Sequence, residues 1–371
     1  MRLRTLAVFF FFLPAVFLLP FAHFAQNAAS QPTVSRPSDP AAFIAAAAPL
    51  NGLEAPGMKP WHIKVGYQVF DDQGKPKEEG IFEEWWAAPD KNKQTYSSST
   101  FHQTIYVTST GRYRRGGQYE PSFAETVVRD RLLNPMASAK IADGTVARVR
   151  SDPFPNTTLD CIELTRPIGF KNDSPPGLFP LYCFEPNQPM LRYSGSEGLL
   201  NTQYLRIGKF NGRFVGADIS ITDAGKPYAK AQLIEGNLLD KIDAADFLPP
   251  VTATPVPSSS GLKAKDFTPG KQISGEEPQN PYAQKHSFDP DLPKLKPVGD
   301  GAALVQRKVV IGVVIDEEGY VRQAAVVSAP DDRYALAALR AVHTWRYQPF
   351  QLHGRPTAAR INVEIPLFMF R

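Results

Sequence analysis

Residues 308–328 read KVVIGVVIDEEGYVRQAAVVS and contain the outline of a β-hairpin. β-Branched residues dominate the first eight positions, and such residues favour strands because their side chains pack well on a pleated surface. Turn-forming residues follow at Asp316-Glu317-Glu318-Gly319, and a second apolar stretch then runs from Tyr320 to Ser328. We therefore predict two antiparallel strands joined by a tight turn.

A helix and a third strand are predicted after this hairpin. Asp331 or Asp332 can cap the helix, and a proline at position 349 ends it because proline cannot continue a helix. A polar turn at 353–356 leads to a strand over residues 360–368, in which apolar and polar residues alternate. The predicted unit over residues 301–371 is therefore β-β-α-β. The apolar face of its helix comprises Ala335, Leu339, Val342 and Trp345.

This unit resembles the TonB C-terminal family over most of residues 305–370. The family has a strand, an Asp-to-Gly turn, a strand ending in Ser, a helix closing on a Trp-x-[Tyr/Phe]-x-Pro step, and a Gly-x-Pro before the last strand. One departure is Arg333-Tyr334, where the family often has Leu-Asp. The resemblance implies packing roles for Asp316, Gly319, Trp345, Tyr347, Pro349 and Gly354, and it also rests on Ser328 and Pro356.

The resemblance also implies a partner. Such domains bind an extended segment of an outer-membrane receptor, or of another envelope protein, by adding its strand to an open sheet edge. The alternative is that the edge is blunted and contributes only stability. The candidate edge is the last strand, with Arg360, Ile361, Asn362, Val363, Glu364 and Ile365.

A longer β-rich region, about residues 38–249, precedes this unit. Asp39-Pro40 predicts the start of a helix that continues to Leu50, and Ser122 with Glu125 forms a capping box for a second helix. Between and after the helices the pattern has the two-residue period of strands. These strands are expected at 61–69, 80–88, 93–100, 104–108, 111–115, 159–165, 181–185, 190–193, 204–210, 213–222 and 228–234.

This order of elements resembles the LolA-like family of periplasmic lipoprotein carriers. The resembling stretches are the strand at Trp61, residues 80–90, the hairpin near 111–113 and the Phe-Leu-Pro-Pro end at 247–250. The resemblance implies a half-barrel whose curved sheet wraps apolar residues around helices and can hold a lipid or acyl chain. Trp61, Trp85 and Trp86 are the candidate lining residues, although adjacent strand residues face opposite ways, so at least one of the neighbouring pair is expected in the core.

Residues 250–300 separate the two units and are rich in proline, serine and lysine. The whole chain has 35 prolines, and in this segment they recur without a helical or strand period. We predict an extended, partly stiff linker.

The N-terminus has the layout of a secretory signal. Arg2 and Arg4 precede an apolar run over residues 6–24, and Ala25 is the expected last residue removed, so that residues 1–25 form the signal peptide. The alternative is an uncleaved inner-membrane anchor, since nineteen residues give roughly 28 Å of helix, nearly the hydrocarbon thickness. The run lacks serine and His23 stands at its far end, which argues against the proton-coupled helix of TonB energisers. Either way the remainder is expected in the periplasm.

Cys161 and Cys183 are the chain's two cysteines and both lie in strand-like surroundings. An exported chain meets an oxidising compartment, so we predict a disulfide between them. Two unpaired buried thiols are the alternative. No histidine lies near either cysteine in the sequence, and no metal or cofactor site is expected.

Composition excludes some classes of function. A hydrophobic fraction of 43% is typical of globular proteins, and a net charge of +4, evenly spread, gives no support for nucleic-acid binding. The motifs of serine hydrolases, zinc proteases and phosphate-binding loops are missing from the sequence, so an enzyme is not expected. We therefore expect an α+β protein that engages an envelope partner by strand addition, in TonB-dependent outer-membrane transport. The alternative is a periplasmic lipid or lipoprotein carrier.

Overall fold

The computed structural model describes residues 39–54, 58–117, 120–137, 139, 146–154, 157–165, 180–195, 200–256, 266–278 and 304–370. The predicted signal, its cleavage site and the alternative anchor at residues 6–24 lie outside these residues. Within them, every helix is too short or too polar to cross a membrane.

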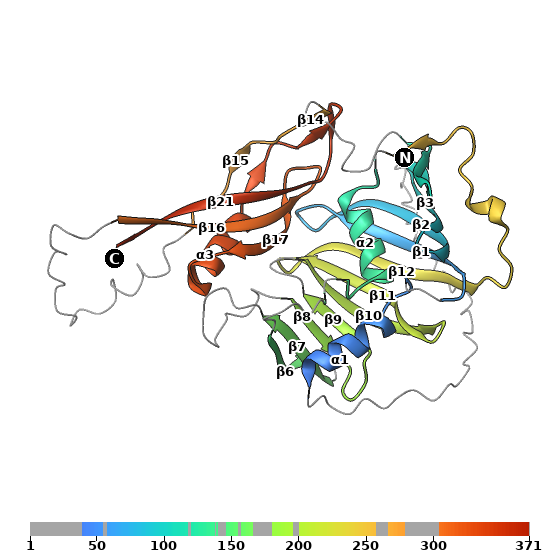
Figure 1. The fold of residues 1–371 in the computed structure, drawn as a ribbon, viewed down its shortest axis with the longest axis horizontal. Coiled ribbons are helices and arrows are strands. Elements are labelled where there is room, and N and C mark those ends of the chain that lie inside the picture. The colour runs from blue at the N-terminus through green and yellow to red at the C-terminus, as the bar shows by residue number, and fades with distance from the viewer. Residues whose placement is uncertain are drawn as a thin grey trace, which may run out of the picture.

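A 13-stranded antiparallel sheet forms the first unit (Figure 1). The strand order is β13-β5-β4-β3-β2-β1-β12-β11-β10-β9-β8-β7-β6, so the two end strands, β13 and β6, do not pair with each other and the sheet stays open. The predicted α+β half-barrel is confirmed. Its strands are β1 (Trp61–Phe70), β2 (Pro76–Ala88), β3 (Lys91–Ser98), β4 (His102–Thr108), β5 (Gly111–Arg115), β6 (Val146–Phe154), β7 (Thr157–Thr165), β8 (Leu181–Phe184), β9 (Leu191–Gly195), β10 (Leu200–Phe210), β11 (Arg213–Asp223), β12 (Lys226–Leu238) and β13 (Thr254–Pro255).

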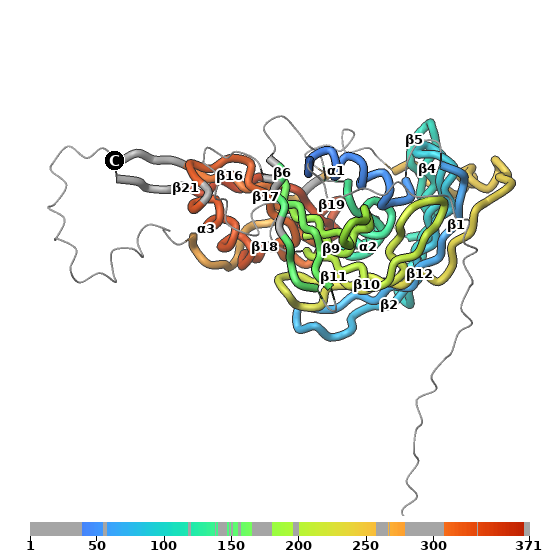
Figure 2. Tube along the Cα trace, turned by 90° about the horizontal axis from the view of Figure 1, so that it is seen from below, coloured from blue at the N-terminus to red at the C-terminus, as the bar shows by residue number. Residues whose placement is uncertain are grey.

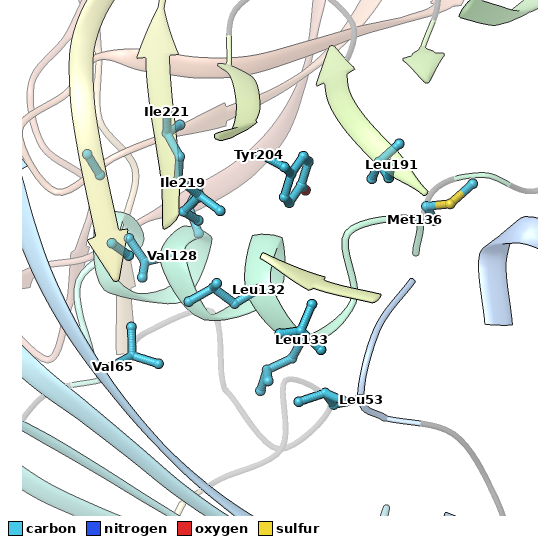
Figure 3. Packing of buried hydrophobic residues seen from close by; sticks show 14 of the residues in the cluster. Leu53, Val65, Val128, Leu132, Leu133, Met136, Leu191, Tyr204, Ile219 and Ile221 are labelled. Carbon is cyan, nitrogen blue, oxygen red and sulfur yellow. The ribbon is translucent and has the colours of Figure 1, made fainter. Parts of the chain in front are cut away.

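Two helices, α1 (Pro40–Ala47) and α2 (Phe123–Leu133), lie against one face of this sheet (Figures 1 and 2). Short 3₁₀ turns follow α1 at Ala48–Leu50 and β12 at Ala244–Phe247. The period of β1 explains the packing, because its residues from Trp61 to Phe70 alternate between buried and partly buried. Figure 3 shows Leu132 and Leu133 of α2 pointing into the core that they share with Ile219 and Ile221 of β11.

Both predicted helix starts are confirmed. A carboxylate oxygen of Asp39 accepts hydrogen bonds from the backbone N–H groups of Ala41 and Ala42, at 3.0 and 3.1 Å. At α2 the Ser122 hydroxyl accepts from the Glu125 N–H at 3.3 Å, and the Glu125 carboxylate accepts from the Ser122 N–H at 2.7 Å. These side chains satisfy backbone donors that have no partner inside the first turn.

The second unit is the predicted β-β-α-β arrangement. Strands β16 (Leu304–Ile315) and β17 (Val321–Ser328) form the hairpin, α3 (Asp332–His343) follows, and β21 (Ala359–Phe370) closes the chain. The sheet order is β17-β16-β21. Asp331 caps α3, since its carboxylate accepts from the Tyr334 N–H at 2.9 Å. The residues of α3 that pack on the sheet include Ala335, Leu339 and Val342, as predicted. The helix ends at His343 rather than at Pro349, so Trp345, predicted on the same helical face, lies after the helix.

Parts of the predicted linker are paired strands. Residues 254–255 form β13 and pair with β5, while β14 (Phe267–Thr268) and β15 (Gln272–Ser274) pair with β19 (Gln351–Leu352) and β18 (Arg346–Tyr347). β19 also pairs with β20 (Arg355–Pro356). We call residues 266–276 the strap, because they run along the segment that follows α3. Strands of two or three residues are too short to show a period, so the sequence could not reveal them.

Strand β6 (Val146–Phe154) was not predicted either. Pro153 lies within it, and a proline argues against a central strand because it lacks a backbone donor. Among the described residues, β6 is the last strand of the large sheet and pairs only with β7, so one side of its backbone needs no donor.

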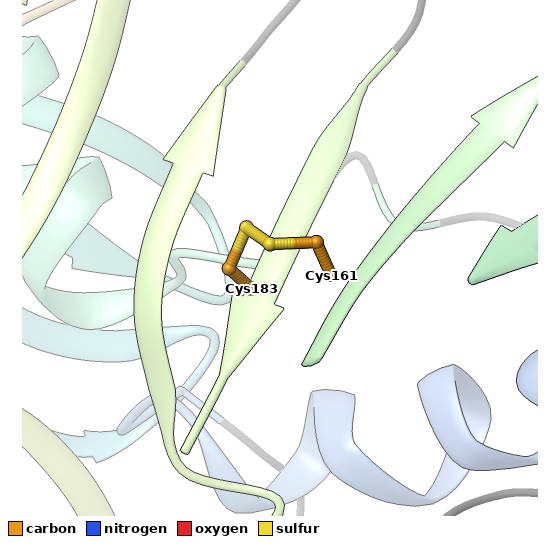
Figure 4. The surroundings of a disulfide bond; sticks show 2 residues. All are labelled: Cys161 and Cys183. Atoms are coloured by element: carbon orange, nitrogen blue, oxygen red, sulfur yellow. A yellow bond between two sulfur atoms is a disulfide. The ribbon is translucent and has the colours of Figure 1, made fainter. Parts of the chain in front are cut away.

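The predicted disulfide is confirmed. Cys161 of β7 and Cys183 of β8 face each other across neighbouring strands and are bonded (Figure 4). Both residues are buried. The bond therefore joins two strands close to the β6 end of the sheet.

Candidate functional site

Strand β21 lies at one edge of the C-terminal sheet. It pairs with β16 alone, in a register that runs from Leu304↔Phe370 to Ile315↔Ala359. In the described part of the chain, its other side has no partner strand. Twelve residues of backbone are thus placed at an open edge.

The six predicted edge residues alternate along β21. Ile365 is buried, and Ile361 and Val363 are partly buried against the core beneath α3. Arg360, Asn362 and Glu364 are exposed on the other face. Glu364 pairs with Lys308 at 2.8 Å, and an exposed pair of this kind adds little stability.

Three of the predicted packing residues meet at the hairpin turn. A carboxylate oxygen of Asp316 accepts from the N–H groups of Glu318 and Tyr320, at 2.9 and 2.8 Å. Gly319 has φ +86°, and a Cβ atom added there would lie 1.9 Å from the backbone oxygen of Tyr347. The Tyr347 N–H in turn donates to the Gly319 oxygen at 2.8 Å. Only glycine fits at this crossing of two backbones.

The other predicted packing residues hold the strap or lie in turns. The Trp345 ring packs partly on the core, and its indole N–H donates to the backbone oxygen of Glu276 in the strap at 2.8 Å. Gly275 lies against the same ring, where a Cβ atom would come within 2.2 Å of Trp345 Cδ1. Pro349 is exposed, and Gly354 has φ +77° in open space. Trp345 therefore secures the strap in addition to its contact with the core.

Arg322 of β17 joins the two units. Its Nε donates to Asp316 Oδ2 at 2.6 Å, and its Nη1 donates to Asp223 at the β11–β12 turn of the first unit. The guanidinium lies over the rings of Tyr228 and Tyr320, at 4.9 and 4.4 Å from their centroids. Only 8% of Arg322 is exposed, so this cation is removed from water and held by two carboxylates and two rings.

The hairpin turn makes three further contacts with the first unit. Tyr320 Oη donates to Asp72 Oδ2 at 2.8 Å, the backbone N–H of Phe123 donates to Glu317 Oε1 at 3.0 Å, and Glu318 forms an ion pair with Lys77. The turn therefore contacts the β1–β2 turn, the first turn of α2 and, through Arg322, the β11–β12 turn. We call Arg322 and residues 316–320, together with these partners, the latch.

Burial raises the pKa values of three acids of the latch. It raises the pKa of Asp223 and of Asp316, and the nearby Arg322 opposes the rise at both. Burial likewise raises the pKa of Glu317. In the sequence, the Asp-Glu-Glu-Gly turn has the pattern of a local turn, and a signal of the wider contact is the arginine inside the mostly apolar strand VRQAAVV.

A cleft of about 510 Å³ lies beside the latch. One wall is the face of the β17-β16-β21 sheet that α3 does not cover, with Val314, Ala325 and Arg360. The opposite wall belongs to the first unit and comes from α2 and the residues after it, including Arg131 and Ala137.

The three tryptophans predicted to line an apolar-ligand site pack against other side chains. Trp61 and Trp86 are buried and stack on each other, with ring centroids 5.8 Å apart. The Trp61 indole N–H donates to the backbone oxygen of Leu53 at 3.0 Å. Trp85 faces the opposite side of the strand, where it stacks on His62 at 4.5 Å and lies beneath the ammonium of Lys93. Neither the interdomain cleft nor a second cavity, of about 210 Å³, is lined by these tryptophans.

Among the described residues, one cluster of three possible metal ligands was found, Asp152 with Cys161 and Cys183. Both sulfur atoms are in the disulfide, so they do not present thiolates to a metal.

A buried ion pair connects α2 to the sheet. Glu84 of β2 is fully buried and receives two hydrogen bonds from Arg129, from Nε at 2.8 Å and from Nη2 at 2.9 Å. Burial outweighs the attraction of Arg129 and raises the pKa of Glu84 to about 7.

This shift predicts a pH dependence for Glu84→Gln. As pH falls through about 7 the folded protein takes up a proton at Glu84, whereas the unfolded chain does so only near 4.5. The wild type is therefore expected to gain stability relative to the glutamine variant between pH 8 and pH 5, because glutamine does not titrate. Thermal unfolding of both proteins across this range measures the difference in Tm. A difference that does not vary with pH would contradict the shifted pKa.

The chain is similar to several solved structures at low sequence identity. Similar solved structures include the LolA superfamily protein NE2245 from Nitrosomonas europaea, 12% identical, covering 56% of this chain and 97% of that one with a TM-score of 0.37. A DUF1329 family protein from Desulfovibrio piger is 9% identical, covering 56% and 95% of the two chains with a TM-score of 0.31. The Pseudomonas aeruginosa MucA/MucB complex is 10% identical, covering 64% of this chain and 71% of that one with a TM-score of 0.29. At these TM-scores the similarities add nothing to the topology described above.

No curated protein matches the chain. A family model does match its C-terminal unit: residues 305–366 match the model of the Gram-negative bacterial TonB protein C-terminal. The match supports an envelope-associated protein. It covers the hairpin, α3 and the start of β21, which is the stretch in which the Asp316–Gly319 turn and the Trp345–Pro349 step carry the resemblance.

Proposed function

We propose that this chain is a non-catalytic periplasmic protein that engages an envelope partner, in the first instance an outer-membrane receptor, by strand addition to β21. The observation that carries the proposal is the position of β21, a strand of 12 residues that pairs with β16 alone. Backbone N–H and C=O groups at an open edge can pair with an extended segment of another protein. The TonB C-terminal match over residues 305–366 supports the same role.

The opposite edge strand, β17, is less suited to this role. It has 8 residues, and Arg322 near its start is engaged in the latch with the first unit. β21 is therefore the longer edge and the one without a latch residue.

The lipid-carrier alternative receives no comparable support from the first unit. The candidate lining residues Trp61 and Trp86 pack against each other, and the core around them contains side chains of both α1 and α2. Mass spectrometry of the purified chain tests this alternative directly, because a carrier is expected to copurify with lipid.

Photo-crosslinking in the native host tests strand addition. A photoreactive phenylalanine analogue at position 362, exposed on β21, is expected to form adducts with an envelope protein. The matched control carries the same analogue at position 328, where Ser328 is exposed at the end of β17. Equal adduct yields from both positions, or adducts from position 328 alone, would refute strand addition at β21.

A further inference from the structure

The interdomain cleft is continuous with the β21 edge. Arg360 and Asn362 are exposed residues of β21, and both line the cleft. The latch holds the first unit opposite them through an arginine that is only 8% exposed and bound to carboxylates on both units. The wall formed by α2 therefore lies on the same side of the sheet as the exposed side chains of β21.

Sheet geometry determines which side chains of an added strand would face this wall. Residues directly opposite each other on neighbouring strands point to the same face, and successive residues alternate. Partner residues opposite Arg360 and Asn362 would thus point toward the cleft. The residues between them would point toward the α3 side, next to Ile361 and Val363.

We propose that the partner site is composite: a strand added to β21 inserts its cleft-side residues between the C-terminal sheet and the α2 wall of the first unit. This inference rests on the strand addition proposed above. It gives the first unit a role in selecting the partner, since the first unit supplies one of the two surfaces that the inserted side chains contact.

The lining of the cleft indicates which side chains fit. Val127 and Ala137 on the α2 wall and Ala325 on the sheet are small or aliphatic. Together these residues leave apolar space beside β21, which suits aliphatic side chains.

Charge complementarity adds a second requirement. Arg360 of β21 is exposed and brings a cation to the cleft. The carboxylate of Asp130 on the opposite wall already faces Arg129 at 3.4 Å and interacts with Arg131. The occupant is therefore an extended protein segment that presents aliphatic residues and at least one carboxylate to the cleft.

Crosslinking from both walls, in the full chain in its native host, tests the composite site. The photoreactive analogue is placed at position 362 on β21 or at position 137 on the α2 wall. Position 241 is the control, because Lys241 is exposed on the first unit and does not line the cleft. The expected result is that positions 362 and 137, but not 241, attach to the same segment of the same partner, and that this segment contains Asp or Glu.

A cleft-filling variant provides the second measurement. Ala137 is exposed, so Ala137→Trp is expected to fold normally while it occupies the space beside β21. Adduct yield from position 362 should then fall about tenfold, equivalent to about 1.4 kcal/mol of lost binding. A matched Lys241→Trp should leave the yield unchanged.

The outcomes separate this inference from the function on which it rests. Adducts from position 362 alone, with a yield insensitive to Ala137→Trp, would overturn the composite site and leave strand addition standing. Lipid adducts from position 137, or a linked segment without Asp or Glu, would overturn the occupant assigned here. No partner adduct from position 362 would overturn both proposals.

Discussion

Replacing Arg322 with alanine is expected to undock the two units and to lower the free energy of unfolding by about 3–5 kcal/mol. The guanidinium binds both Asp316 and Asp223, and it also lies over the rings of Tyr228 and Tyr320. Alanine would leave both carboxylates partly buried without their cation. That cost exceeds the loss of an exposed ion pair, which is usually below about 1 kcal/mol.

Two measurements on the full chain check this prediction. Urea unfolding gives the free energy, and small-angle X-ray scattering gives the radius of gyration, which should increase if the units separate. Arg340→Ala is the control, because Arg340 is exposed on α3 and is not one of the latch residues. If Arg322→Ala unfolds like the control and keeps the wild-type radius of gyration, the latch does not hold the units together.

The latch also shows where sequence reasoning reached its limit. The turn Asp316–Gly319 was predicted because Asp and Gly are local turn formers, and the structure places them in a turn between β16 and β17. Its contacts with Asp72, Asp223 and Phe123 depend on residues more than 90 positions away in the chain. A charged turn in a sequence normally indicates a solvated loop, so no local pattern distinguishes one that docks.

Elements with a strong period or a cap were predictable. β1, with five buried alternating residues from Trp61 to Val69, and α2, with its Ser122–Glu125 capping box, were both expected close to their observed bounds. The strap was not predictable, because the strands that it forms with residues 346–352 are only two or three residues long. Its hydrogen bond with the Trp345 indole joins residues far apart in the sequence, which no local pattern reveals. For the candidate site, alternation in β21 indicated which face is exposed, but the α2 wall opposite could come only from the structure.

Gly319→Ala is expected to destabilise the C-terminal unit by about 4 kcal/mol, from a positive φ and a backbone clash acting together. Gly319 has φ +86°, and the new Cβ atom would lie 1.9 Å from the Tyr347 oxygen. Backbone atoms on both sides cannot move independently, because the Tyr347 N–H is hydrogen-bonded to the Gly319 oxygen and the Gly319 N–H to the Asp316 oxygen. The hairpin turn and the segment after α3 would have to separate.

Gly354→Ala is the matched control for this substitution. Gly354 has a similar φ of +77°, but a Cβ atom there meets nothing within 4 Å. It should therefore show only the backbone strain, about 1–2 kcal/mol. Hydrogen exchange of peptides from β16 and β21, measured by mass spectrometry in the full chain, reports the stability of this unit without contribution from the larger sheet. Equal protection in the two variants would mean that the crossing of Gly319 and Tyr347 is not a constraint on the fold, whereas a larger loss in Gly319→Ala would show that this backbone contact, rather than the φ value alone, requires glycine.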